Sequence, residues 1–139
     1  MSKAQENIAM MRRVFQEAFN ENKMEVIDQC YTEDYDFDAP TLPGQPKPIG
    51  REAFKARVQA FAASFENINY EIQECISDGD VVCTIFVFGG KNVKPFAGFA
   101  ATGRDAKITG VHFAKIENGK IRKTWAGFTN IMEQLAAQG

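Results

Sequence analysis

The amino-acid sequence predicts an α+β fold with the helices first and an antiparallel sheet after them. Three observations support this prediction. Apolar residues recur at helical spacing up to residue 65, they alternate with polar residues from residue 68, and Asn118-Gly119 separates two alternating runs. The 139 residues are 45% hydrophobic and include 12 Phe, which is enough apolar mass for one core. We therefore expect residues 1–139 to form a single domain.

Three helices are predicted in the first half of the chain. Ser2 is a plausible N-cap of the first helix, Asn20–Asn22 interrupt the pattern before a short second helix, and the third helix begins near Gly50. Between the second and third helices, residues 35–40 alternate as a short strand does and end in a proline-rich loop. The apolar faces comprise Met11, Val14, Phe15, Ala18 and Phe19 in the first helix, Ile27, Cys30 and Tyr31 in the second, and Phe54, Val58, Phe61 and Phe65 in the third.

Strands are predicted in the second half. Residues 68–76 alternate between apolar and polar, which is typical of a half-buried strand. Residues 81–88 are apolar on both faces, so we expect this strand to be covered on both sides. A strand-like stretch follows at residues 96–101.

Asn118-Gly119 predicts a tight hairpin between residues 107–117 and 120–128, because both central residues of a type I′ turn need positive φ. An uninterrupted register places Lys115 opposite Arg122 and His112 opposite Trp125. The face with His112 and Trp125 otherwise carries mainly small residues, as the wall of a cavity beneath helices does. The apolar base of the opposite face is a candidate dimer surface.

Composition excludes several classes of protein. A net charge of −2 argues against a general nucleic-acid binder, although residues 1–80 hold 15 acidic and 8 basic residues and residues 81–139 hold 3 and 8. No apolar run approaches the ~18 residues of a membrane span, and the first residues have no secretory apolar region. The three cysteines are widely spaced without a CxxC pair, so we expect reduced thiols and a cytoplasmic protein.

No cofactor or metal site is expected. His112 is the single histidine, so it cannot join a multi-histidine metal site. The glycine pairs match no phosphate loop, and the sequence contains no nucleophile elbow, zinc spacing or dinucleotide fingerprint.

Several segments together resemble a known family. They are YTEDYDFDAP before a Pro/Gly loop, PIGREAFKARV at the third helix, TGR-x-x-x-ITG before GVHFAKIENGKI, and then Trp125. On these motifs the chain resembles the SnoaL-like polyketide cyclase family, within the nuclear transport factor two-like superfamily, over about residues 8–130. The resemblance implies a cone in which three helices pack on a curved, mostly antiparallel sheet around an apolar pocket. It also implies a homodimer formed through the sheet.

The resemblance further implies cofactor-free ring closure by aldol condensation, with an aspartate just beyond the tryptophan as acid/base and a histidine assisting. This chain departs from that pattern, because it has no Asp or Glu from Ile121 to Met132.

Two residues are catalytic candidates. His112 suits proton transfer if it lines a pocket, and the alternative is a hydrogen-bonded core or surface histidine. Asp38 is the best remaining carboxylate, and the alternative is a solvated aspartate that caps the proline loop. The tyrosines are candidate hydrogen-bond donors to an oxyanion, or core residues. The ligand-binding candidates are Tyr31, Tyr35, Phe54, Phe88, Trp125 and Thr129.

Three functions are open at this point. The first is a cofactor-free enzyme, a cyclase or isomerase, that acts on a small hydrophobic carbonyl compound through His112 and Asp38. The second is a non-catalytic protein that binds a small hydrophobic ligand, and the third is a dimerisation module. In each case we expect a cytoplasmic homodimer without nucleic-acid, membrane, metal or cofactor partners.

Overall fold

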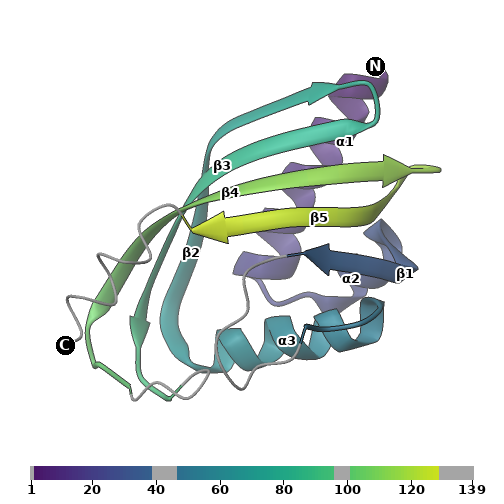
Figure 1. Ribbon diagram of the computed structural model, residues 1–139. Helices are drawn as coiled ribbons and strands as arrows, with labels where there is room; N and C mark the ends of the chain where they lie inside the picture. The colour runs from purple at the N-terminus through teal and green to yellow at the C-terminus, as the bar shows by residue number, and fades with distance from the viewer. Residues whose placement is uncertain (1, 39–46, 96–100, 129–139) are drawn as a thin grey trace.

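The computed structural model describes residues 2–38, 47–95 and 101–128. Its helices pack on a five-stranded sheet, and the first helix continues in a π-helical segment, η1 (Figure 1). The predicted α+β class is confirmed. Most of the strand expected at residues 96–101 lies outside the described residues. The elements are α1 (Lys3–Arg13), η1 (Val14–Asn20), α2 (Met24–Cys30), β1 (Tyr31–Asp38), α3 (Arg51–Ala63), β2 (Phe65–Asp78), β3 (Val81–Asn92), β4 (Asp105–Glu117) and β5 (Lys120–Phe128).

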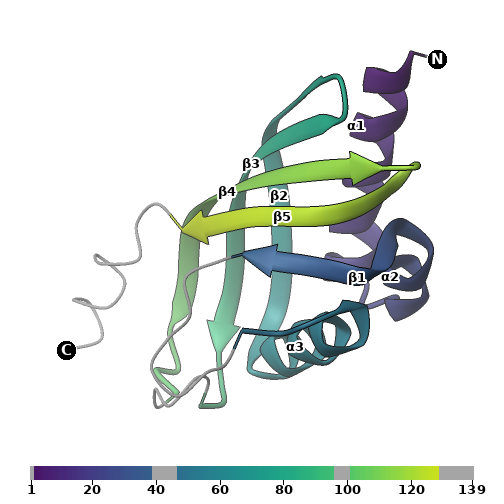
Figure 2. The ribbon, with the colours of Figure 1, turned by 45° about the vertical axis from the view of Figure 1, so that its right-hand side comes forward.

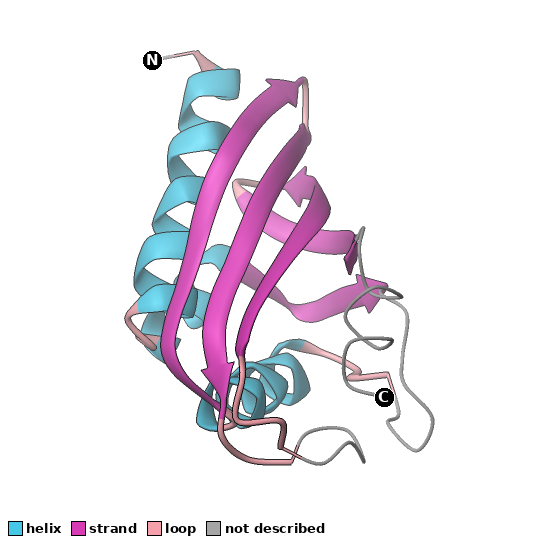
Figure 3. Ribbon diagram, turned by 90° about the vertical axis from the view of Figure 1, so that its left-hand side faces the viewer, coloured by secondary structure: helices cyan, strands magenta, loops and turns pink. Residues whose placement is uncertain are grey.

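The sheet is open and mostly antiparallel. Its strand order is β1-β5-β4-β3-β2, and β1 runs parallel to β5 while the other neighbours are antiparallel. In Figures 1 and 2 the helix α3 lies beside β1, and α1 lies behind the strands. Figure 3 shows the long strands bending over α1. We call the helix-covered face of the sheet the inner face and the opposite one the outer face.

The first helix begins as the sequence predicts. The Ser2 hydroxyl accepts a hydrogen bond from the Gln5 backbone N–H at 3.2 Å, and the Gln5 side chain accepts one from the Ser2 N–H at 2.9 Å. From Val14 the winding widens to a π-helix, which ends before Asn22 at a positive φ of 58°. Apolar spacings of three and four residues fit both windings, so the sequence pattern does not distinguish them.

Two element boundaries differ from the prediction. Tyr31 adopts an extended conformation and opens β1 instead of closing α2. Phe65 opens β2, because the Ser64 backbone carbonyl accepts a hydrogen bond from Val93 at 2.9 Å and thereby starts the pairing with β3. Both residues remain hydrophobic positions against the core, so only the type of element changes.

The core is a layer of aromatic rings between the helices and the inner face. Phe15 of η1 packs edge-on against Phe86 of β3, with ring centroids 5.2 Å apart. Phe86 pairs with Gly110 on β4, where an added Cβ would lie only 2.4 Å from the Phe86 Cζ. Gly110 is therefore the residue that lets this ring lie flat on the sheet.

The predicted register of the β4–β5 hairpin is wrong beyond its first two pairs. Ile116 faces Ile121 as expected, but Lys115 faces Lys123, so Arg122 is an extra residue in a β-bulge. Arg122 reaches across to β1, where its guanidinium donates to the Asp34 carbonyl at 3.0 Å. The bulge shifts every later pair by one residue, which places Trp125 on the outer face.

The strand predicted at residues 81–88, which lies in β3, was expected to be covered on both sides. Helices cover it on the inner face only. Ile85 of β3 is 38% exposed on the outer face, and its neighbour Val111 on β4 is partly exposed. Among the described residues no helix is both long enough and apolar enough to cross a membrane.

Candidate functional site

His112 projects from the inner face of β4 into the aromatic core. It is 5% exposed, and the Phe15 ring lies edge-on to the imidazole with centroids 5.4 Å apart. Burial disfavours the charged imidazolium and lowers the His112 pKa to about 4, so the ring is neutral at pH 7. Its Nδ1 has no hydrogen-bond partner within the described residues.

Four buried hydroxyl groups share this lack of a partner among the described residues, namely those of Tyr31, Thr32, Tyr35 and Thr124. The two tyrosine rings meet edge-on with centroids 4.7 Å apart. Burial raises the pKa of both phenols, and the neighbouring Thr124 hydroxyl opposes part of the rise at Tyr35. At neutral pH both phenols are therefore protonated hydrogen-bond donors.

The structure brings only some of the ligand-binding candidates together. Tyr31, Tyr35 and Phe54 form one buried aromatic group, in which Phe54 lies 5.2 Å from Tyr31 and 4.8 Å from Tyr35 between centroids. Phe88 belongs to another group and packs against Phe61 at 5.1 Å. Thr129 lies outside the described residues.

The expected pairing of His112 with Trp125 is wrong. Ala126 is the residue opposite His112, and Trp125 is 40% exposed on the other side of the sheet. Thr124 was not a candidate from the sequence, but the bulge at Arg122 turns it into the core, where it is completely buried. Alternation counted from the hairpin turn assigns Thr124 to the outer face, so no local pattern indicated its position.

Asp38 does not share a cavity with His112. Its side chain is 51% exposed, and its carboxylate lies 4.0 Å from the Lys123 ammonium on the outer face. Asp36, two residues earlier, binds the same lysine at 3.4 Å and Lys47 at 2.8 Å. These neighbouring lysines hold the pKa of Asp36 below its usual value. The two catalytic candidates, Asp38 and His112, therefore lie on opposite faces of the sheet.

No carboxylate joins the buried histidine in the described part of the chain. The buried polar side chains there are Asn7, Ser64, Thr84, His112 and Thr124. Within the same ranges, no three His, Cys, Asp or Glu side chains are grouped so as to hold a metal ion.

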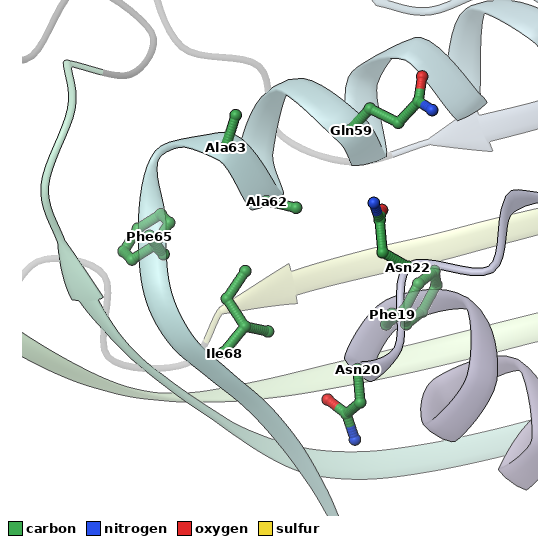
Figure 4. A pocket seen from close by; sticks show the side chains of 8 residues that line it. All are labelled: Phe19, Asn20, Asn22, Gln59, Ala62, Ala63, Phe65 and Ile68. Atoms are coloured by element: carbon green, nitrogen blue, oxygen red, sulfur yellow. The ribbon is translucent and has the colours of Figure 1, made fainter.

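An open cleft of about 310 Å³ lies between η1, α3 and the start of β2 (Figure 4). Asn20 fixes one side of it, because its side chain accepts a hydrogen bond from the Tyr70 N–H at 2.6 Å and donates to the Tyr70 carbonyl at 3.0 Å. Phe19 connects the cleft to the core, since its ring lies 5.1 Å from that of Phe15. The lining comprises Phe19, Asn20, Asn22, Gln59, Ala62, Ala63, Phe65 and Ile68. None of these was a ligand-binding candidate from the sequence.

Solved structures share this architecture. TsrD from Streptomyces laurentii superposes with a TM-score of 0.83 at 21% identity, covering 100% of this chain and 98% of TsrD. A protein from Jannaschia sp. CCS1, named as a SnoaL-like polyketide cyclase, gives 0.87 at 15% identity and coverages of 100% and 96%. IdmH from Streptomyces antibioticus, named as a polyketide cyclase, gives 0.78 at 24% identity and coverages of 95% and 99%. At these identities the likeness shows the fold alone.

A search of curated proteins gave no match. The family model for SnoaL-like polyketide cyclases matches residues 9–136, which is nearly the whole sequence. The chain therefore belongs to the SnoaL-like polyketide cyclase family.

Proposed function

We propose that this protein binds a small hydrophobic carbonyl compound and catalyses a cofactor-free proton transfer on it, with His112 as the group that exchanges or donates the proton. The observation that carries the proposal is the state of His112, which is a neutral, buried imidazole with an unpartnered Nδ1 in the described structure. A neutral imidazole in apolar surroundings can donate to a carbonyl oxygen or accept a proton from carbon. The family and the fold are consistent with a cyclase-like pocket protein.

The proposal differs from the family's aspartate-based chemistry. Asp38 receives no role, because its carboxylate lies on the outer face beside Lys123. Tyr31 is the proposed phenolic donor, since burial keeps its phenol protonated and its hydroxyl has no partner in the described structure.

Deuterium exchange into 2-tetralone, an aryl ketone with acidic α hydrogens, tests this function. We expect the protein to accelerate exchange in D2O, measured by mass spectrometry, and His112→Gln to reduce the acceleration about 100-fold. Exchange that is lost in Asp38→Asn and kept in His112→Gln would assign the proton transfer to Asp38 and overturn the proposal. Thermal unfolding of both variants shows whether they remain folded.

A second candidate, a non-catalytic ligand-binding module, is favoured by one observation. The described ranges contain no buried Asp or Glu, so the core lacks a strong base there. In that case 2-tetralone would shift the unfolding temperature of the wild-type protein without any accelerated exchange.

We also propose that the protein is a homodimer formed through the outer face. The cross-strand neighbours Ile76, Cys83, Phe113 and Trp125 form an apolar row across four strands. Ile76 is 64% exposed, and Phe113 and Trp125 are each 40% exposed. A second copy of the same face would cover this row. The three free thiols fit the cytoplasm, which is the proposed location.

A further inference from the structure

His112 and Thr124 occupy opposite corners of a square on the inner face, and alanines occupy the other two corners. His112 pairs with Ala126, and Ala114 pairs with Thr124. Diagonal neighbours of this kind are about 7–8 Å apart along the backbone. The other two residues of this square, Ala114 and Ala126, have only a methyl group as side chain. The register therefore places two buried polar side chains on one diagonal of the square, with small residues on the other.

The polar atoms at this square lack partners in the described structure. They are His112 Nδ1 and the hydroxyl oxygens of Thr124 and Tyr35, which lie near each other but not in hydrogen-bond geometry. Thr124 is completely buried and Tyr35 almost so. Burying a polar atom without a hydrogen bond is unfavourable, and native proteins meet such atoms with ordered water.

We infer that one buried water molecule binds among His112, Thr124 and Tyr35. A buried water makes about three hydrogen bonds, which matches the three polar groups at this place. The water accepts from one of the two hydroxyls, donates to the other, and donates to His112 Nδ1. The imidazole then carries its hydrogen on Nε2.

Thr84 lies on β3, on the other side of His112, and is not a partner of this water. It pairs directly with His112 on β3 and is completely buried, but its hydroxyl already lies 3.5 Å from the Cys75 thiol. Thr124 and Tyr35 are thus positioning residues that set the tautomer of His112 through the water. The water site itself does not depend on the proposed function. Only the effect of this water on catalysis rests on that proposal.

The single histidine makes the test direct, because the 139-residue chain gives one pair of imidazole ¹⁵N resonances. In the wild type at pH 7 we expect an unprotonated Nδ1 and a cross-peak between the ring protons and a bound water. Thr124→Val should move the Nδ1 resonance and remove the cross-peak. Thr84→Val, an identical change at the neighbouring buried threonine, should keep both. Tyr35→Phe preserves the ring packing and should also move the Nδ1 resonance, so it replaces Thr124→Val if that variant fails to fold.

A hydrogen on Nδ1 in the wild type, an unchanged spectrum in Thr124→Val, or an equal change in Thr84→Val would overturn the inference. The ketone-exchange assay separates this result from the proposed function. Exchange by the wild type without a water cross-peak refutes the water site alone, and a cross-peak without exchange refutes the catalytic proposal alone.

Discussion

Phe113 and Trp125 are cross-strand neighbours on the outer face, and their rings meet edge-on with centroids 5.7 Å apart. The Lys123 ammonium lies 4.7 Å from the centroid of the Trp125 ring, within the range of a cation–π contact. This arrangement exists because the bulge at Arg122 turned the tryptophan away from the core. It places the only tryptophan of the chain where it can report on the proposed dimer.

Phe113→Glu should convert the dimer to a monomer, because it puts a charge at the centre of the apolar row. Sedimentation should show half the wild-type mass, and the Trp125 emission should move to longer wavelength as water reaches the ring. Ile49→Glu is the control, since Ile49 is an exposed isoleucine outside the row. A wild-type protein that sediments as a monomer at micromolar concentration would contradict the proposed dimer.

Stability should fall as the pH drops from about 6.5 to about 4, and His112 should account for this part of the profile. The folded His112 has a pKa of about 4 against an ordinary value of 6.5, so within this window only the unfolded chain binds the proton. The expected loss is about 3 kcal/mol. Urea unfolding at several pH values measures it. His112→Gln should remove this slope, and an unchanged slope would show that other groups cause it.

The lowered pKa values of Asp36 and Asp80 affect a different pH range. Lys47 and Lys115 respectively stabilise their charged forms, so these pairs contribute above the ordinary aspartate value of 3.8 and are lost as the pH falls below it. The histidine effect therefore falls mainly at higher pH than the loss of these aspartate contributions.

Gly110→Ala should destabilise the protein by about 1–3 kcal/mol, because the new methyl group would overlap the Phe86 ring. Chemical unfolding measures the change. Gly89→Ala is the matched control on the neighbouring strand, where the nearest atom to an added Cβ is 3.8 Å away. Equal stability of the two variants would mean that Phe86 moves aside at little cost.

Asn20→Ala should cost about 1–3 kcal/mol, because it removes both hydrogen bonds to the Tyr70 backbone and leaves that part of β2 unpaired on this side. Amide hydrogen exchange at Tyr70 should accelerate with it. Gln16→Ala removes only exposed side-chain contacts to Asn20 and Glu21 and should change stability by less than about 0.5 kcal/mol. Unchanged exchange at Tyr70 in Asn20→Ala would show that the strand holds its position without the asparagine.

Features determined by neighbouring residues could be predicted from the sequence. The Ser2 cap, the start of α3 after Gly50 and the Asn118-Gly119 turn all depend on residues within a few positions of one another. Gly50 and Gly119 have φ angles of 85° and 78°, which glycine adopts without strain. These local signals were enough to predict the order of most elements.

Features determined by distant residues could not be predicted in the same way. The bulge at Arg122 is held by Asp34, which is 88 positions away in the sequence, and it decides that Thr124 rather than Trp125 enters the core. The parallel register of β1 with β5 likewise decides on which side of the sheet Asp38 lies. One residue of shift in this hairpin therefore changed the membership of the candidate site, although the elements themselves were correct.

The parallel pairing of β1 with β5 also constrains how the chain is made. A ribosome delivers β1 long before β5, and β1 has no neighbour on the sheet other than β5. The nascent chain must therefore hold Tyr31 and Tyr35 without their final strand partner until residues 120–128 have left the exit tunnel. The sheet is completed at its β1 edge only at that moment, and until then the four acidic residues of β1 oppose its pairing with another copy of the chain.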